Sequence, residues 1–428
     1  MNRTYQIDER NAIAQFRSHL TTDPGSIQLI LPLADLAQRL RNGVDQMLFE
    51  AERELLLLII DDEVACLIGG RHRRCDSRLA SRWGKAAGSV VIHGQKVPIQ
   101  RPRVRGRGGE LKLGSYELFR QQDQMQRKIW ERVMRGLTMR GYGPAVRDNE
   151  STFGISKSAV SDRFIAGSAD RVGDLRKRDL SKLRLCALML DGVEYRQEHF
   201  VVALGIDKTG AKTVLGFHQG ASENQQICDR LLADLAGRGL DLKQSFLVGI
   251  DGSRALRASV KKHCSELVLV QRCQIHKGRN VCEHFADDQK GHWDRKLQNA
   301  YNLIGYAEAK KALGQIHREL MHVNPSAARS LEEGLEETLT VHRLGVPVEL
   351  RRTLRSTNPI ESAFSRVRTV CQNVKRWRPG DQRERWIGSA LLFAEQKFRR
   401  IVGYKSLPKL IAILDAQTGT SKIAGRVA

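Results

Sequence analysis

The sequence predicts an α/β protein in which a strand-rich core follows a basic N-terminal region of helices and a β-hairpin. Two observations lead to this prediction. From Lys182 onward, short apolar runs typical of buried strands alternate with segments of helical periodicity. Before Lys182, helical patterns and turn signals alternate with clusters of arginine. The 428 residues leave room for two or three domains.

The charge of the chain indicates a nucleic-acid partner. Lysine and arginine outnumber aspartate and glutamate by 71 to 48, which gives a formal net charge of +23. Self-repulsion of this size disfavours the compact state, so we expect a polyanion whose phosphates neutralise it. A membrane fits less well, because the most apolar run, Leu55 to Ile60, is too short to span a bilayer and has acidic flanks. Without a signal pattern or a disulfide framework of cysteines, the chain is predicted to be cytoplasmic.

Residues 1–70 form the first predicted region. Apolar residues recur at helical spacing from Leu33 to Leu48, and a wide apolar face follows from Glu52 to Leu67. This pattern is typical of helices that pack within a small domain. A dimer contact would produce the same pattern, and the sequence leaves both interpretations open.

Residues 71–120 are predicted to form a basic β-hairpin that contacts DNA. Ser89–His93 and Lys96–Gln100 are rich in β-formers, and Gly94-Gln95 between them suits a type II′ turn. After the hairpin, arginines at every second position would share one face of a strand, and contact with phosphate explains such a face without acids better than solvation does. The candidate contacts are Arg71, Arg73, Arg74, Arg101, Arg103, Arg105 and Arg107.

Residues 121–180 predict a helix-turn-helix. A helix from Gln124 to Arg140 precedes a glycine break, and a tight turn at Phe153–Ser156 leads into a second helix that Ser156 can cap. A plain helical hairpin would have a similar pattern. The candidate DNA contacts are Ser156, Lys157, Ser161 and Arg163.

The core is predicted from the order of its elements. Three strands, a helix, a strand, a helix and a strand follow one another, which is the order of a ribonuclease H-like fold. The first strand, Leu183–Leu190, ends in Asp191, and the fourth, Ser245–Ile250, ends in Asp251. These strands are neighbours in that fold, so the two carboxylates would lie side by side.

Two adjacent carboxylates predict a metal site. They repel each other, so one would be protonated unless a cation holds both. Hard oxygen ligands suit Mg²⁺, and two such ions about 4 Å apart can clamp an in-line phosphoryl transfer. An aspartate at a strand end is also a common turn or capping residue. The pairing of Asp191 with Asp251 in a strongly basic chain favours catalysis.

A third carboxylate is expected from Glu361. Asn358 as helix cap, Pro359 at the first helical position and Glu361 at the third would make an ordinary capping box. Arg368 lies about two turns further on and would share the face of Glu361, where it could hold a DNA phosphate. Spacing alone leaves the cap and the catalyst equally open.

The chain resembles the Mutator-type transposases of bacterial insertion sequences, a family of DDE transposases, from about residue 30 to 415. The matching segments include Val201–Ile206, Leu232–Leu235, Arg238–Leu240, Gln271–His276 and Thr357–Ser362. The resemblance implies that Asp191, Asp251 and Glu361 hold two Mg²⁺ or Mn²⁺ ions. It also implies that Cys273 and His276 form a C-x₂-H signature.

Two cysteines and two histidines also invite a zinc interpretation. The spacing of Cys273, His276, Cys282 and His284 is too cramped for most structural zinc sites. We therefore favour a packing or active-site role for His276.

The separation of Asp251 from Glu361 exceeds what the basic fold needs and predicts a helical insertion, with helices at Leu297–His322 and Ala327–Leu344. The core would then occupy residues 181–275 and 351–428, and the insertion residues 276–350. The C-terminal part is rich in arginine and tryptophan, which departs from the family pattern. Its candidate DNA contacts are Arg368, Lys375, Arg376 and Arg378.

The resemblance implies a DNA transposase that acts near the bacterial nucleoid. Bound metal would activate water to hydrolyse a phosphodiester at the element's end, and the released 3′-OH would attack target DNA. The N-terminal regions would bind the terminal inverted repeats, and a homodimer is expected because two ends must be paired. A structure-selective nuclease and a domesticated DNA-binding regulator are the alternatives.

Overall fold

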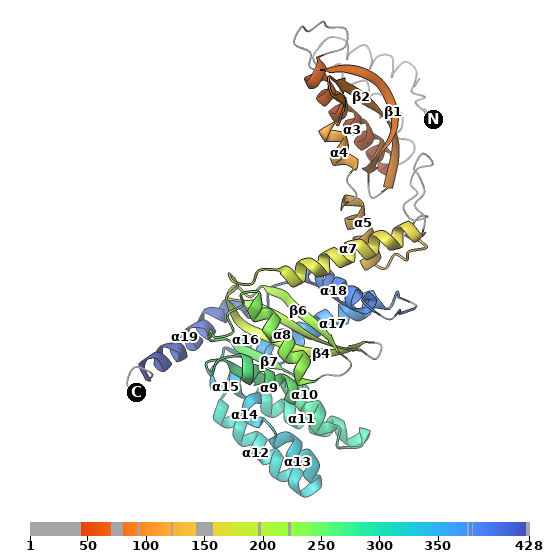
Figure 1. Cartoon of the computed structure of the whole chain (residues 1–428). Coiled ribbons are helices and arrows are strands. Elements are labelled where there is room, and N and C mark those ends of the chain that lie inside the picture. Colours follow the sequence, from red (N-terminus) through yellow and green to blue (C-terminus); the bar gives the residue numbers. More distant parts are fainter. Residues whose placement is uncertain are drawn as a thin grey trace, which may run out of the picture. The chain divides into compact units, whose positions relative to one another are not determined.

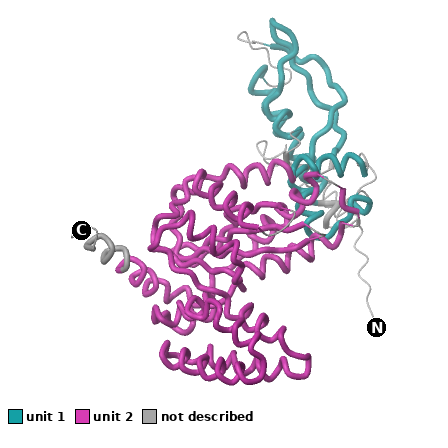
Figure 2. The backbone as a smooth tube through the Cα atoms, turned by 60° about the horizontal axis from the view of Figure 1, so that its bottom comes forward, with its two compact units in different colours: residues 1–167 teal, residues 168–428 magenta. Residues whose placement is uncertain are grey.

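The computed structural model describes residues 44–69, 80–92, 95–120, 123–142, 157–195, 198–220, 224–374, 376–378 and 380–424. The chain forms two compact units, residues 1–167 and residues 168–428 (Figure 2). The long helix α7, Lys157–Lys177, crosses this boundary. The division between units therefore lies within α7, whereas the sequence analysis put a domain boundary near residue 180.

In the first unit, one helix packs on a three-stranded antiparallel sheet. The helix is α3, Val44–Ile68, and the strands are β1, Ala80–Ile92, β2, Gln95–Gly106, and β3, Gly109–Leu111 (Figure 1). A short helix, α4, Gly114–Arg120, follows. Ile60 and Val64 of α3 share a core with β-branched residues of the strands. This core holds the hairpin against α3.

The hairpin prediction is confirmed, with two corrections. Gln95 pairs with Ile92 across the sheet, so Gln95 is a strand residue and not a turn residue. The predicted break between Leu48 and Glu52 is absent, because no glycine or proline interrupts α3, while residues 33–43 of the first predicted helix lie outside the described residues.

The elements expected to form a helix-turn-helix are described in part. The first helix, α5, Asp123–Met134, ends before the predicted Arg140, and Gly136 with φ +104° follows it. A positive φ is open to glycine at little cost, so the chain leaves the helix there. Ser156 and the turn that it was predicted to close lie outside the described residues.

The second unit is built on a five-stranded sheet with the order β6-β5-β4-β7-β8. Strand β4 pairs antiparallel with β5 and parallel with β7, which in turn pairs parallel with β8. The bounds are Leu185–Tyr195 for β4, Glu198–Asp207 for β5, Lys212–Gly220 for β6, Leu247–Ile250 for β7 and Leu269–Arg272 for β8. The predicted α/β class and order of elements are confirmed, except that β4 runs four residues past Asp191.

Helices cover both faces of this sheet. Helices α8, Gln225–Gly237, and α9, Arg254–His263, share one hydrophobic core with the strands. Gly216 of β6 lies against α8, and the next residue, Phe217, lies against Gly388 of α18. Successive strand residues point to opposite faces, so α18 covers the face opposite α8.

A helical insertion with its own hydrophobic core separates β8 from the last helices. Its helices are α10, Gln274–Cys282, α11, Asp287–Asn302, α12, Tyr306–Val323, α13, Pro325–Glu332, α14, Leu335–Thr338, α15, Thr340–Arg343, and α16, Val348–Leu354. The helix predicted over Leu297–His322 is two helices, because the chain breaks between Asn302 and Tyr306, where Gly305 caps α12 with an extended backbone.

The chain then returns to the sheet. The last elements are α17, Asn358–Cys371, α18, Gln382–Glu395, the 3₁₀ turn η3, Tyr404–Ser406, and α19, Leu407–Ala424. Helix α17 packs against β4, the strand that carries Asp191, and α18 packs against β6 at the edge of the sheet. Among the helices that the structure describes, none is long and apolar enough to cross a membrane.

The close approach of α18 to the sheet leads to a stability prediction. A Cβ on Gly388 would lie 2.7 Å from side-chain atoms of Phe217 and Val172. We expect Gly388→Ala to lower the free energy of unfolding by about 1–3 kcal/mol, because the helix must move off the sheet. Gly173→Ala is the matched control, since a Cβ at that position would meet no atom within 4 Å. It should stabilise α7 by up to about 1 kcal/mol. Urea denaturation measures both, and equal effects would contradict the close contact.

Candidate active site

Asp191, within β4, and Asp251, directly after β7, lie at matching positions of neighbouring parallel strands. Strands β4 and β7 run parallel with Leu190 opposite Ile250, and an aspartate is the next residue in each chain segment. Asp191 is only 4% exposed, and one of its oxygens accepts the Gly192 N–H at 2.9 Å. Asp251 Oδ1 accepts the Ser253 N–H at 2.8 Å, as in a turn that starts a helix. Asp251 can therefore stabilise the turn and still take part in the candidate site.

Glu361 extends from α17 into the site, and its side chain does not cap the helix. The helix begins at Asn358, with Thr357 as its N-cap, so Pro359 is the second helical residue and Glu361 the fourth. The predicted capping box is therefore wrong by one residue. The Asn358 N–H donates to Ser356 Oγ at 3.4 Å, and Glu361 Oε1 instead accepts the Thr357 hydroxyl at 2.8 Å. The carboxylate is thus available to the site.

The pKa of Asp191 responds to the other two carboxylates. Burial, together with the charges of Asp251 and Glu361, raises the pKa of Asp191 to about 7, while His276 opposes this rise. A buried acid among like charges holds a proton or needs a cation. A divalent metal with oxygen ligands would satisfy this demand.

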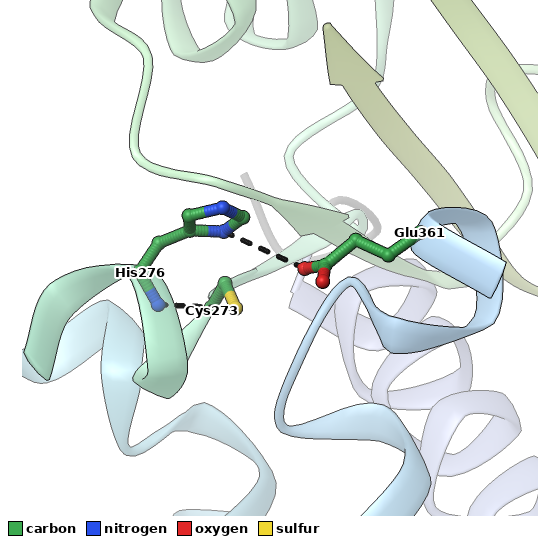
Figure 3. Close-up of side chains that lie close together, drawn as sticks. All are labelled: Cys273, His276 and Glu361. Atoms are coloured by element: carbon green, nitrogen blue, oxygen red, sulfur yellow. Dashed lines mark hydrogen bonds and ion pairs between the residues drawn. The ribbon is translucent and has the colours of Figure 1, made fainter. Parts of the chain in front are cut away.

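Cys273 and His276 complete the cluster (Figure 3). Cys273 caps α10, and its sulfur accepts the backbone N–H groups of His276 and Thr357, each at 3.5 Å. His276 Nδ1 lies 3.9 Å from Glu361 Oε1 and 3.3 Å from Thr357 Oγ1. The first turns of α10 and α17 are therefore joined through one thiol and one hydroxyl.

The protonation state of His276 determines which groups donate the hydrogen bonds in this cluster. The Cys273 side chain, with Asp191 and Glu361, raises the pKa of His276 to about 9. The imidazolium therefore predominates at neutral pH and donates from both ring nitrogens. His276 Nδ1 donates to Thr357, and the Thr357 hydroxyl donates to Glu361. Thr357 fixes the carboxylate, a role that the sequence analysis missed although Thr357 stands in the Thr357–Ser362 motif.

The four-residue zinc site that the sequence left open is not assembled. In the part of the chain that the structure describes, the candidate metal group with closely spaced ligand atoms is Cys273, His276 and Glu361, within 4.8 Å of one another. The Cys282 thiol instead contacts the Lys290 carbonyl at 3.7 Å. His276 instead lies beside Glu361, in the candidate site.

The predicted arginine face of the hairpin exists, with corrections. Arg101, Arg103 and Arg105 point away from buried Val104, but Arg107 follows the end of β2. The face is not free of acid, because Glu110 of β3 lies 3.0 Å from Arg101 and 2.7 Å from Arg103. The Arg103 and Arg105 guanidinium groups also lie over the ring of Trp83. This face is a paired cluster with a net positive charge.

The other candidate DNA contacts have different surroundings. Arg71, Arg73, Arg74, Ser156 and Lys375 lie outside the described residues. Lys157, Arg368, Arg376 and Arg378 are exposed, while Ser161 and Arg163 are half-buried.

Trp377, in the part of the chain rich in arginine and tryptophan, packs with other aromatic side chains. Its ring meets Tyr195 at 5.3 Å and Trp386 at 6.3 Å, both edge to face. Trp386 itself is buried. Both tryptophans therefore anchor the C-terminal helices beside β4.

Comparison with known proteins gives one family. A family model described as transposase, Mutator family, matches residues 27–398. The chain is 26% identical to a transposase for insertion sequence element IST2 of Acidithiobacillus ferrooxidans, over 50% of this chain and 70% of that protein. It is 23% identical to a transposase for insertion sequence element ISRM5 of Rhizobium meliloti, over 76% and 81% respectively. Identity to the transposase for insertion sequence element IS256 of Staphylococcus aureus is 22% over 75% and 83%.

The raised pKa of Asp191 leads to a prediction about stability in the absence of metal. The folded protein binds this proton more tightly than the unfolded chain, so stability is lost as the pH rises from 3.8 to about 7. Asp191→Asn should therefore be more stable than the parent by a few kcal/mol above this window and by little below it. Thermal unfolding in chelator measures the difference, with Asp415→Asn at an exposed aspartate as the control. A variant less stable than the parent throughout would contradict the prediction.

Proposed function

Because the chain belongs to the Mutator family of transposases, we propose that it binds the terminal inverted repeats of an insertion sequence and catalyses metal-dependent DNA cleavage and strand transfer. The observation that carries this proposal is the convergence of Asp191, Asp251 and Glu361 from two parallel strands and a helix. Buried carboxylates placed together cost stability unless they bind a cation. Such an arrangement is favoured by catalysis and not by folding.

The three carboxylates fit a pair of Mg²⁺ or Mn²⁺ ions. The raised pKa of Asp191, caused by burial and by the like charges of Asp251 and Glu361, supports a cation at this position. When bound, such ions activate water, or the 3′-OH, and stabilise the charge that develops on the phosphate. His276, which carries a positive charge at neutral pH, stands beside the carboxylates and can attract a DNA phosphate.

We propose a ribonuclease H-like core for this unit. The order β6-β5-β4-β7-β8, with β4 in the centre, supports this assignment. So does the helical insertion between β8 and α17, which separates the second aspartate from the glutamate in sequence but not in space. The remaining parts of the core, residues 351–428, return the chain to the sheet.

DNA recognition is assigned to the first unit and the start of α7. The arginine face of β2, stacked on Trp83 and only in part neutralised by Glu110, supports contact with the DNA backbone. The helix-turn-helix of residues 121–180 would read the inverted repeat, acting on DNA of the nucleoid in the cytoplasm. A homodimer would pair the two ends, and exposed Leu48, Leu55 and Ile59 on α3 support a contact between two copies.

The direct test uses the full chain and its flanking DNA. Incubation with end-containing duplex and Mg²⁺ should give cleavage at the end and joining to target DNA, and Asp251→Asn should reduce both below detection. Asp241→Asn, at an exposed aspartate, is the matched control. Cleavage without end specificity or joining would favour a nuclease. Binding without any cleavage would favour a regulator, and an active Asp251→Asn would refute the site.

The hydroxyl between His276 and Glu361 allows a sharper test. Thr357→Val keeps the shape but removes the hydrogen bond to Glu361 Oε1. We expect cleavage to fall about 10- to 100-fold, as for other residues that orient metal ligands. The half-maximal Mg²⁺ concentration should rise as well.

Thr357→Ser keeps the hydroxyl and should restore most of the activity, which separates positioning from packing. The role assigned to Thr357 would be untenable if the valine and serine variants had equal rates and equal Mg²⁺ dependence.

A further inference from the structure

A cavity of about 530 Å³ lies in the insertion, between α10 and α11. Its walls include Gln274 and Gly278 of α10, Asp294 and Leu297 of α11, and Arg355 from the end of α16. Binding sites for small organic ligands typically have volumes of about 300–1,000 Å³, so this cavity is large enough for roughly one nucleotide. None of the roles assigned above uses this cavity.

The cavity adjoins the carboxylate cluster. Gln274 directly follows Cys273 and lies two residues before His276, while Arg355 lies two residues before Thr357. The Gln274 N–H donates to the Arg355 carbonyl at 3.0 Å, which ties the two walls together. A group in the cavity would therefore be a close neighbour of a group bound at the carboxylates.

The charge of the cavity favours an anion. Arg279 lines it, and among the described residues its guanidinium has no acidic partner. The Arg355 guanidinium donates to the neutral Asn302 amide oxygen at 2.7 Å, and burial lowers the pKa of Arg355. The acid in the wall, Asp294, already accepts a hydrogen bond from Gln298 at 2.7 Å. Two arginines without an acidic partner suit a phosphate.

A buried acceptor favours a second kind of group. Gln274 is 4% exposed, and its amide nitrogen donates to the Thr338 carbonyl at 2.8 Å. Its oxygen is buried without a hydrogen-bond partner. An unsatisfied buried acceptor is unfavourable, so a ligand that supplies an N–H would remove this penalty. Each of the four DNA bases carries an N–H donor on its pairing edge, in the ring or on an amino group.

We propose that this cavity receives one unpaired nucleotide of the DNA strand, adjacent to the phosphate that is cut. Arg279 and Arg355 hold its phosphate, Gln274 Oε1 accepts an N–H of its base, and Leu297 covers part of the base. This inference rests on the proposed function, because it needs DNA at the carboxylates. Taking a base out of the stack is unfavourable, and these contacts offset that cost.

The test places 2-aminopurine, whose fluorescence rises on unstacking, at successive positions of an end-containing duplex. The full chain is added with Ca²⁺ in place of Mg²⁺, so that the strand is not cut. We expect a rise at one position next to the cleavage site. Arg279→Ala should abolish this rise and weaken binding of the duplex about tenfold. Arg318→Ala, an exposed arginine of α12 outside the cavity, is the matched control and should change neither.

Three results would overturn the proposal while the transposase function stands. The first is cleavage in Mg²⁺ with no fluorescence rise at any position. The second is a rise that Arg279→Ala leaves unchanged, since the base would then lie elsewhere. The third is Arg279-dependent binding of a free deoxynucleotide without a rise in the duplex, which would make the ligand a free nucleotide. Absence of any cleavage by the parent chain would instead refute the proposed function and this inference with it.

Discussion

The parallel pairing of β4 with β7 is the constraint on which the rest of the site depends. Leu190 lies opposite Ile250, so the next residue of each segment, Asp191 and Asp251, comes to the same point of the sheet. A shift of one residue in either strand would turn one carboxylate to the opposite face. The register is held by apolar side chains that α8 and α9 cover, and a buried face of this kind fixes register strongly. The hydrophobic core thus fixes the positions of Asp191 and Asp251, although placing two like charges together is unfavourable for folding.

The insertion is joined to this sheet by buried polar groups. The Gln271 amide donates to the Thr338 carbonyl at 2.8 Å and accepts the Val341 N–H at 2.9 Å. Arg272 is 5% exposed and donates to the carbonyls of Gly252 and Glu333, both at 3.0 Å. Gly252 follows Asp251 directly, so the insertion and the second aspartate share one hydrogen-bond network. Such networks specify a single arrangement, because a broken member leaves a buried group unsatisfied.

The third carboxylate is held by contacts of another kind. Cys273 joins the start of α10 to the start of α17, and Thr357 passes a hydrogen bond from His276 to Glu361. The contacts of Thr357 with Cys273 and His276 connect residues more than eighty positions apart in the sequence. They also explain why the motif around Glu361 resembles a helix cap. Thr357, Asn358 and Pro359 do begin the helix, and the glutamate that follows is turned toward the sheet.

The sequence by itself determined the α/β class, the hairpin, the order of strands and the positions of both aspartates, because apolar periodicity and turn residues are local signals. Residue spacing alone did not decide between a cap and a ligand at Glu361, nor foresee Glu110 among the arginines or the hydroxyl of Thr357. Those features depend on which distant segments meet: β3 folds back on β2, and α17 returns to β4 after the insertion. Only the tertiary structure decided them, since a carboxylate takes its pKa and its role from neighbours that chain spacing does not reveal.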